Sequence, residues 1–150
     1  MQKGVDYIGV GVGAVIINND GKIFLSKRGR NVRNESGTWE FPGGGVEFGE
    51  KIEDTIQREM KEEYGIDIEI VELIGVNNHL IPLEKQHWVS PCFLCKLKSG
   101  RPEILEPDKC DEIGWFDLDE ILSFPLSLVT QSNLEHIKNK YNNILPNQKV

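Results

Sequence analysis

Three glutamates in the middle of the chain, Glu59, Glu62 and Glu63, have the spacing of a metal-binding edge. In a helix, which turns about 100° per residue, Glu59 and Glu63 project within about 20° of Ile52, and Glu62 lies about 80° to one side. Like charges this close raise one another's pKa and lower stability unless a cation neutralises them. The group therefore predicts a site for a hard divalent cation with oxygen ligands. A solvated acidic face, balanced by neighbouring basic residues, is the alternative that the residues alone leave open.

The segment that carries these acids has the pattern of an amphipathic helix. It spans Glu50–Tyr64 without proline or glycine, and Ile52, Ile56 and Met60 recur at every fourth position. That period packs one stripe of side chains against a core. Acidic residues fall in the first turn, where free N–H groups point, and Gly65 can adopt the left-handed conformation just after the last turn. We therefore expect this helix to hold the acids beside its buried stripe.

The acids belong to a longer pattern of fixed positions. It consists of Gly44, Glu50, Arg58, Glu59, apolar Met60, Lys61, Glu62, Glu63, Tyr64, Gly65 and apolar Ile66. At every fixed position this pattern resembles the signature of the Nudix hydrolase family. The resemblance is specific within this segment, because many specified positions match at fixed spacing. It extends, with less specificity, over most of the chain.

The resemblance implies a loop, a helix and a loop that bind Mg²⁺ or Mn²⁺. The implied metal ligands are Glu59, Glu62, Glu63 and the carbonyl of Gly43. Arg58 would orient a glutamate, and it completes the expected catalytic set with the three acids. The implied reaction is attack of water on a diphosphate that joins a nucleoside to another group. Metal ions would neutralise the repulsion between the phosphate oxygens and the carboxylates.

Family members often take a further metal ligand or general base from a loop outside the signature. The stretch EPDKCDEIGWFDLDEI resembles the segment in which that residue arises. Glu106 opens this stretch, whereas Glu112 precedes Trp115 by three residues, a spacing that recurs in the family. The resemblance does not decide between the two glutamates, and Glu112 is included in the expected metal set.

Residues before and within the glycine loop are expected to bind substrate. Arg28 belongs to a basic group that precedes the strand entering the loop, where it could contact phosphate. Trp39 could stack on a base or belong to the core, whereas Phe41 is expected in the core. The loop glycines let the backbone approach a ligand closely. The expected substrate-binding set is Arg28, Trp39, Gly43, Gly44 and Gly45.

The surroundings of the signature favour one branch of the family. The stretches GTWEFPGGGVEFGE and EPDKCDEIGWF look most like MutT-like members, which hydrolyse a nucleoside triphosphate to the monophosphate and pyrophosphate. Hydrolysis of ADP-ribose or a nucleotide sugar is the alternative, since Pro82 lies about where ADP-ribose-cleaving members carry a proline. The intact glutamates disfavour a sensor that binds a nucleotide without cleaving it, and the unaltered signature disfavours an isoprenoid diphosphate isomerase.

Composition limits the remaining classes of protein. A chain of 150 residues with 39% hydrophobic residues can bury one core, so residues 1–150 are expected to form a single domain. The net charge of −7 disfavours a nucleic-acid polymer as partner, because Lys and Arg bind phosphate backbones. No apolar run approaches a bilayer span and no signal-peptide pattern is present, so we expect a cytoplasmic protein without a membrane partner. The sequence leaves open whether the chain forms a homodimer.

The cysteines and histidines are expected to be structural. Three cysteines make an odd number, which suits a reducing compartment. Cys92 and Cys95 have metal-like spacing but lie in an apolar segment, where a strand would place them on opposite faces. Together with Cys110 they are expected in the core. His79 and His87 lie near loop ends and are left out of the site.

Short apolar segments separated by turn signals predict strands around the helix. They are Tyr7–Ile17, Lys22–Arg28, Trp39–Phe41, Asp67–Asn77, His87–Lys98 and Glu112–Phe116. Between and after them we expect a loop over His79–Gln86, a helical turn capped by Asp117 or Asp119, and a second main helix over Pro125–Tyr141. Strands with two main helices predict an α/β protein with a mixed β-sheet, in agreement with the Nudix-type α/β/α sandwich that the resemblance implies.

Overall fold

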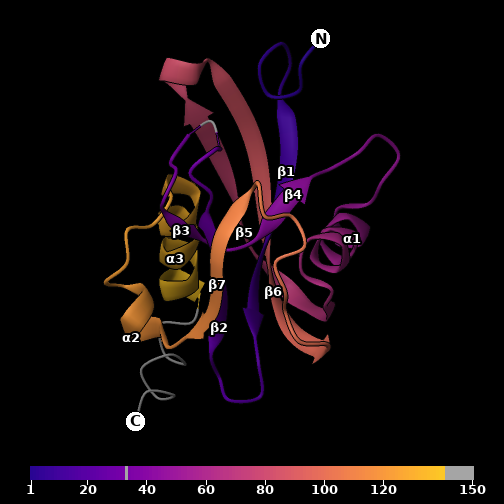
Figure 1. Ribbon diagram of the computed structural model, residues 1–150. Coiled ribbons are helices and arrows are strands. Elements are labelled where there is room, and N and C mark those ends of the chain that lie inside the picture. The colour runs from indigo at the N-terminus through magenta and orange to yellow at the C-terminus, as the bar shows by residue number, and fades with distance from the viewer. Residues whose placement is uncertain (33, 141–150) are drawn as a thin grey trace.

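The computed structural model describes residues 1–32 and 34–140. A mixed β-sheet lies between two helices, α1 (Ile52–Tyr64) and α3 (Leu128–Lys140) (Figure 1). The strands are β1 (Gly9–Ile17), β2 (Ile23–Arg28), β3 (Trp39–Glu40), β4 (Gly43–Gly45), β5 (Asp67–Ile81), β6 (Gln86–Ser99) and β7 (Cys110–Phe116). Two short helices, η1 (Pro82–Glu84) and α2 (Leu118–Ile121), follow β5 and β7. The predicted α/β sandwich is confirmed.

The sheet is built around β1. Its strand order is β3, β2, β1, β6 and β5, with β4 also paired to β1 and β7 to β2. The pair β1 and β6 is parallel, and the other named pairs are antiparallel. β4 pairs with Gly11–Gly13 of β1, whereas β2 pairs with its far end at Ile17. This arrangement places the glycine strand β4 at the sheet position next to α1.

Buried side chains form one cluster on each face of the sheet. The α1-side cluster consists of Val12, Ala14, Ile16, Phe24, Ile56, Met60, Tyr64, Ile66, Ile68, Phe93, Cys95 and Cys110. The α3-side cluster consists of Val15, Ile23, Leu25, Trp39, Phe41, Ile74, Cys92, Ile121, Leu134 and Ile137. Cys92 and Cys95 lie on opposite faces and all three cysteines are buried, so the core placement expected of them is confirmed.

The helix α1 has the buried stripe and the end that its sequence predicts. Ile56 and Met60 are fully buried, and Gly65 closes the helix in the left-handed conformation with φ of 71°. The helix begins at Ile52 and not at Glu50. Glu50 instead closes a turn with Glu47, whose backbone N–H donates to its carboxylate at 3.2 Å. Glu50 therefore contacts α1 from the preceding loop, where Arg58 donates hydrogen bonds to it.

The helix α3 is attached to β3 by hydrogen bonds. Trp39 N donates to the Pro125 carbonyl at 2.8 Å, and Ser127 N donates to the Trp39 carbonyl at 3.0 Å. Phe41 N donates to Thr130 Oγ1 at 3.1 Å. These contacts fix the short segment that leads into β4.

The boundaries of α3 differ from the prediction. The segment from Pro125 to Ser127 pairs with β3, so the helix begins at Leu128 and not at Pro125. Its predicted end, Tyr141, lies outside the described residues. No helix in the described part of the chain is both long enough and apolar enough to cross a membrane.

Two strand boundaries also differ from the prediction. The predicted loop His79–Gln86 continues β5 to Ile81 and starts β6 at Gln86, with η1 as the connection. Cross-strand pairing, such as that of Leu80 with His87, keeps these residues extended. β7 begins at Cys110, two residues before the predicted Glu112, because Cys110 still pairs with Arg28 of β2. The expected helical turn is α2, which Asp117 caps together with Glu120.

Candidate active site

Arg58 of α1 connects three glutamates. Its Nε and Nη2 donate to the two carboxylate oxygens of Glu50 at 2.7 and 3.0 Å. Its Nη1 donates to Glu59 at 2.8 Å and to Glu62 at 3.1 Å. The hydrogen bonds from Arg58 and Thr55 lower the pKa of Glu50 to about 2. The planar guanidinium thus fixes Glu59 and Glu62 relative to the loop before the helix, which is the orienting contact expected of Arg58.

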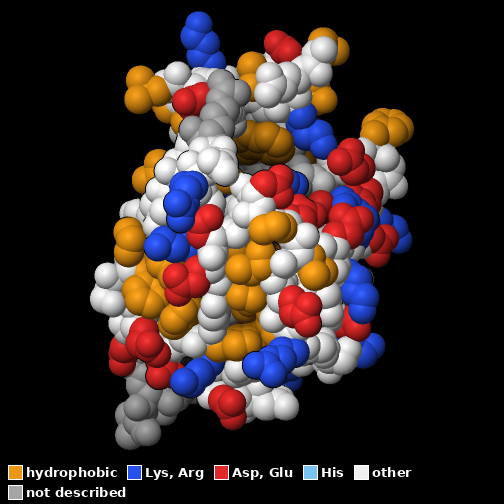
Figure 2. Space-filling model, in the orientation of Figure 1, with side chains coloured by type: hydrophobic (Ala, Val, Ile, Leu, Met, Phe, Trp, Pro, Cys, Tyr) orange, Lys and Arg blue, Asp and Glu red, His pale blue; other side chains and the backbone are white. Residues whose placement is uncertain are grey.

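A cavity of about 460 Å³ lies beside α1, and we call it the acidic cavity. Glu63, Glu106, Lys109 and Gly43 are among the residues that line it. Burial, followed by the charges of Glu59 and Glu106, raises the pKa of Glu63 to about 8. Burial also raises the pKa of Glu59. Figure 2 shows acidic side chains gathered beside α1, with Lys and Arg side chains among them.

The structure distinguishes between the two candidates for an extra ligand. Glu106 lines the acidic cavity, and its Oε1 lies 2.9 Å from Lys109 Nζ. Glu112 is exposed on β7, opposite Lys27 of β2, and does not line that cavity. Glu112 therefore lies outside the acidic cavity, contrary to the expectation that placed it in the metal set, whereas Glu106 lines that cavity. The spacing between Glu112 and Trp115 was misleading, because spacing alone does not give the direction in which the strand points the Glu112 side chain.

The glycines of β4 leave room for the acids. A side chain at Gly44 would collide with the carboxylate end of Glu59. A side chain at Gly43 would collide with the backbone carbonyl of Val12 on β1. Gly45 is less confined, since a Cβ there would meet only Lys3 Nζ, at 3.8 Å. Close approach of β4 to both β1 and Glu59 thus requires glycine at two of the three positions.

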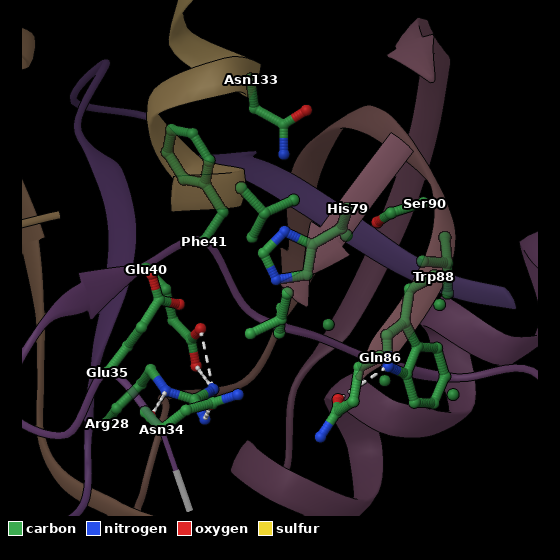
Figure 3. Close-up of a pocket in the computed structure, with 18 residues that line it drawn as sticks. Arg28, Asn34, Glu35, Glu40, Phe41, His79, Gln86, Trp88, Ser90 and Asn133 are labelled. Carbon is green, nitrogen blue, oxygen red and sulfur yellow. Dashed lines mark hydrogen bonds and ion pairs between the residues drawn. The ribbon is translucent and has the colours of Figure 1, made fainter. Parts of the chain in front are cut away.

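A second cavity, of about 350 Å³, adjoins the first, and we call it the amide cavity (Figure 3). Arg28, Glu40 and Gly43 line both cavities. The rest of its wall comprises glycine backbone, the apolar residues Val12, Phe41, Ile81 and Val129, and the polar or aromatic side chains of Asn34, Glu35, His79, Gln86, Trp88, Ser90 and Asn133. The two cavities therefore share part of their walls, and acids line one of them whereas the wall of the other is mixed apolar and polar.

Arg28 stands where the cavities meet and is held by neighbours. Its Nη1 donates to both carboxylate oxygens of Glu40, at 3.2 and 3.3 Å. Its Nε donates to the Asn34 carbonyl at 3.0 Å, and its Nη2 donates to Asn34 Oδ1 at 2.9 Å. Burial raises the pKa of Glu40, and the Arg28 charge opposes that shift. Arg28 thus lines both cavities with its guanidinium held by Glu40 and Asn34.

Trp39 does not reach the site. Its ring packs against Phe116 at 5.3 Å and against Phe124 at 5.4 Å between centroids, and the residue is 8% exposed. It lines neither cavity. Trp39 therefore belongs to the α3-side cluster, which is the core placement that the sequence left open, and it lies outside both cavities, contrary to the expectation that it binds substrate.

Most residues of the amide cavity were not predicted, and three of them are His79, Trp88 and Asn133. His79 was expected to be structural, and Trp88 and Asn133 were not assigned to the site, yet all three line the cavity. They come from β5, β6 and α3, which are far apart in the sequence. No local spacing could have grouped them.

The acids fit a divalent metal by the chemistry of their oxygen atoms. Carboxylates and a backbone carbonyl are the ligands that Mg²⁺ and Mn²⁺ take in proteins. The groups that would hold the metal are Glu59, Glu62, Glu63, Glu106 and the carbonyl of Gly43. In the described part of the chain, no three acidic, histidine or cysteine side chains form a finished ligand arrangement. Arg58 and Lys109 are the counterions of these carboxylates in the structure.

Comparison with known proteins places the chain among Nudix proteins. The family model of the NUDIX domain matches residues 8–137. An ADP-ribose pyrophosphatase from Methanocaldococcus jannaschii is 35% identical over 106 residues, which cover 71% of this chain and 60% of that protein. An RNA pyrophosphohydrolase from Pseudoalteromonas translucida is 42% identical, with 75% of each chain covered.

Solved structures agree. The crystal structure of a MutT NUDIX hydrolase from Burkholderia pseudomallei is similar with a TM-score of 0.80 and 39% identity, and the match covers 88% of this chain and 99% of that chain. A NUDIX hydrolase from Nitrosomonas europaea has a TM-score of 0.75 at 23% identity over 89% of this chain and 90% of its own, a likeness of fold alone. With its signature helix, its acids and its sandwich fold in place, the chain belongs to the Nudix family of hydrolases.

Proposed function

We propose that the chain hydrolyses the diphosphate bridge of a nucleotide with the help of Mg²⁺ or Mn²⁺. The proposed substrate is a nucleoside triphosphate, and the products are the monophosphate and pyrophosphate. The observation that carries this proposal is the pair of neighbouring cavities, one acidic and one mixed, that share Arg28, Glu40 and Gly43 in their walls. A nucleotide has the same two parts, a polyanion that requires metal ions and a flat base with an apolar face and polar edges.

The residues of the site have separate tasks in this proposal. Arg58 holds Glu59 and Glu62, and Gly44 leaves the space that the Glu59 carboxylate occupies. Arg28 supplies a fixed positive charge at the point where the phosphates would pass between the cavities. When bound, a divalent metal would polarise the phosphorus centre and acidify water. The proton of the attacking water passes to a carboxylate of the same cluster.

Two other classes of substrate would be cleaved by the same chemistry. ADP-ribose and nucleotide sugars are the second candidates, supported by the similarity to the Methanocaldococcus ADP-ribose pyrophosphatase. RNA with a 5′-triphosphate is a third candidate, supported by the similarity to the Pseudoalteromonas RNA pyrophosphohydrolase. The excess of 24 acidic over 17 basic residues favours a mononucleotide over a polymer, whose backbone requires basic contacts.

A substrate panel tests the proposal. Nucleoside triphosphates, ADP-ribose, UDP-sugars and a 5′-triphosphate RNA are incubated with Mg²⁺ and with EDTA, and the products are separated by ion-exchange chromatography. Glu59→Gln serves as the inactive control. We expect Mg²⁺-dependent release of pyrophosphate from a triphosphate. Faster cleavage of ADP-ribose would support the second candidate, and no turnover with any compound would contradict hydrolysis altogether.

A further inference from the structure

Two cations pair with the acids beside α1, and they are held in different ways. Arg58 donates hydrogen bonds to three glutamates, and its side chain is 32% exposed. Lys109 has an ion pair with Glu106, in which Nζ lies 2.9 Å from Oε1, and its side chain is 63% exposed. The planar fork of Arg58 is therefore a fixed counterion. The flexible side chain of Lys109 can instead turn from its partner toward solvent.

The oxygen that Lys109 contacts has the properties of a metal ligand. Glu106 Oε1 is shielded from solvent, and within residues 1–32 and 34–140 it accepts no hydrogen bond of regular geometry. The charge of Lys109 is therefore what compensates this buried oxygen in the structure. A buried carboxylate oxygen requires a cation beside it, and a divalent metal meets that requirement as an ammonium group does.

The backbone holds this ion pair at the wall of the acidic cavity. Lys109 N donates to the Glu106 carbonyl at 3.0 Å, which closes a turn between the two residues. The Lys109 carbonyl accepts a hydrogen bond from Gly29 N at 2.9 Å. A Cβ at Gly29 would lie 3.1 Å from the carbonyl carbon of Lys109, so the loop packs closely against β2 at this point. The ammonium group can therefore move by rotation of its side chain while the loop backbone stays in place.

The charge of Lys109 also acts on other acids of the cavity. Contact with Glu106 raises the pKa of Lys109, and the charges of Glu63 and Glu59 act in the same direction. In return, the Lys109 charge opposes the rise in the pKa of Glu63 that burial causes. A positive charge this close to the carboxylates repels a second cation among them. Lys109 therefore opposes a metal ion both by its contact with Glu106 and by its charge.

We propose that Lys109 competes with the divalent metal for Glu106 and thereby sets the metal affinity of the chain. This inference rests on the proposed function, because it assigns a role toward the metal that the hydrolysis requires. On metal binding, the Lys109 ammonium group turns from Glu106 to solvent and leaves Oε1 as a ligand. On metal release, Lys109 returns to Glu106. The same ion pair therefore stabilises the metal-free chain and weakens metal binding.

Mn²⁺ titrations followed by electron paramagnetic resonance test this competition in the absence of nucleotide. We expect Lys109→Met to lower the dissociation constant of the tightest Mn²⁺ site by about 3- to 30-fold, since a repelling charge and a competitor are both removed. Lys109→Arg keeps the charge and should not lower the constant. Lys138→Met is the matched control, because Lys138 forms an ion pair of the same sequence spacing with Glu135 on α3, at 3.5 Å. It should leave the constant within about twofold of wild type.

A variant of Glu106 separates competition for its carboxylate from repulsion at a distance. Glu106→Gln removes the charge that attracts Lys109, and the titration is repeated with and without Lys109→Met in this background. If the two residues act as a pair, the effect of Lys109→Met should shrink to about twofold or less. An equal effect of Lys109→Met in both backgrounds would overturn competition for Glu106.

Melting temperatures in EDTA and in Mg²⁺ provide a second measurement and show that each variant is folded. Without metal, Lys109→Met should melt below the wild type, because Glu106 then lacks its counterion. Added Mg²⁺ should raise the melting temperature of this variant by more than that of the wild type, since the metal binds more tightly. A smaller rise than in the wild type would contradict the competition.

The outcomes separate this inference from the proposed function. An unchanged or weaker Mn²⁺ affinity in a folded Lys109→Met variant would overturn the inference and leave the hydrolysis standing. Tighter Mn²⁺ binding by Lys109→Met, in a chain whose wild type cleaves no nucleotide, would overturn the hydrolysis and support the competition. A wild-type chain that binds no Mn²⁺ would overturn both.

Discussion

At the scale of single residues, Arg58 determines how the acids of the signature are presented. It makes hydrogen bonds with Glu50, Glu59 and Glu62 through all three guanidinium nitrogens. Arg58→Lys keeps the charge but loses the planar fork, so the glutamates should lose their common orientation. We expect kcat to fall by about 10- to 100-fold, together with weaker Mn²⁺ binding in a titration followed by electron paramagnetic resonance.

Lys61→Met is the control for that change. Lys61 lies on the same helix, but its ion pair is with the exposed Asp67 at 3.4 Å. Its loss should leave both kcat and metal affinity within about twofold of wild type, as expected for a surface pair. An Arg58→Lys chain with unchanged kcat would show that the fork does not orient the acids.

Glu63 gives the metal-free chain a specific pH dependence. Its pKa is about 8 in the folded chain, whereas a glutamate in the unfolded chain ionises near about pH 4.3. Between these values the folded state binds more protons, so the free energy of unfolding falls as pH rises. The Glu63→Gln variant lacks this carboxyl group, so its free energy of unfolding does not fall with pH for this reason. The substitution should stabilise the metal-free chain by about 2 to 4 kcal/mol at pH 8, with no gain near pH 4.

Urea unfolding in EDTA at several pH values measures this difference. Glu62→Gln is the control, because the Glu62 side chain is 54% exposed and its removal should change stability by about 1 kcal/mol or less. Both variants should lose most activity if these acids hold the metal. A Glu63→Gln chain that is less stable than wild type at pH 8 would contradict the burial of an uncompensated carboxyl group.

At the scale of elements, β4 and α1 must approach closely for the site to exist. A side chain at Gly44 meets the carboxylate of Glu59, so Gly44→Ala should displace that acid and reduce kcat by at least about tenfold. Gly45→Ala, whose Cβ meets only Lys3 Nζ at 3.8 Å, should keep near-normal activity. Equal activity of the two variants would show that the space above Gly44 is not required.

The elements that could be predicted from sequence are those that local patterns determine. The helix α1, its end at Gly65 and its edge of acids follow from the period of side chains along one segment. The extension of β5 and β6 through His79–Gln86 could not be predicted, since cross-strand pairing overrides the polar residues and Pro82. The contact between Asn77 and Asn133 joins residues 56 positions apart, beyond any local pattern.

Side-chain direction was the weaker part of the sequence-based prediction. Trp39 and Glu112 both lie on strands next to the site, yet each points away from it. Asn133 and Glu106, which do line the cavities, come from a helix and a loop whose positions only the assembled sheet determines. Residue type and spacing therefore indicated the residues around the acidic cavity better than those around the amide cavity.

At the scale of the whole molecule, metal binding should stabilise the fold. The acidic cavity concentrates carboxylates from α1 and the loop before β7, so a cation bound there favours the folded chain by mass action. The melting temperature should rise with Mg²⁺, by the equivalent of about 2.7 kcal/mol at one hundred times the dissociation constant. At pH 8 and without metal, the Glu63→Gln variant should have a higher melting temperature than the wild type. Added Mg²⁺ should raise that melting temperature by less than in the wild type. An equal rise of the melting temperature in the wild type and in Glu63→Gln would show that the metal binds outside the acidic cavity.

The central claim is that water attacks within the diphosphate bridge and not at the terminal phosphate. The measurement is hydrolysis of a nucleoside triphosphate with Mg²⁺ in ¹⁸O-labelled water, followed by mass spectrometry of the products. We predict the monophosphate and pyrophosphate, with one labelled oxygen in one of the two, because the acidic and amide cavities share Gly43 in their walls and would bind the bridge beside it. Labelled orthophosphate released with the nucleoside diphosphate as the first products would contradict this claim.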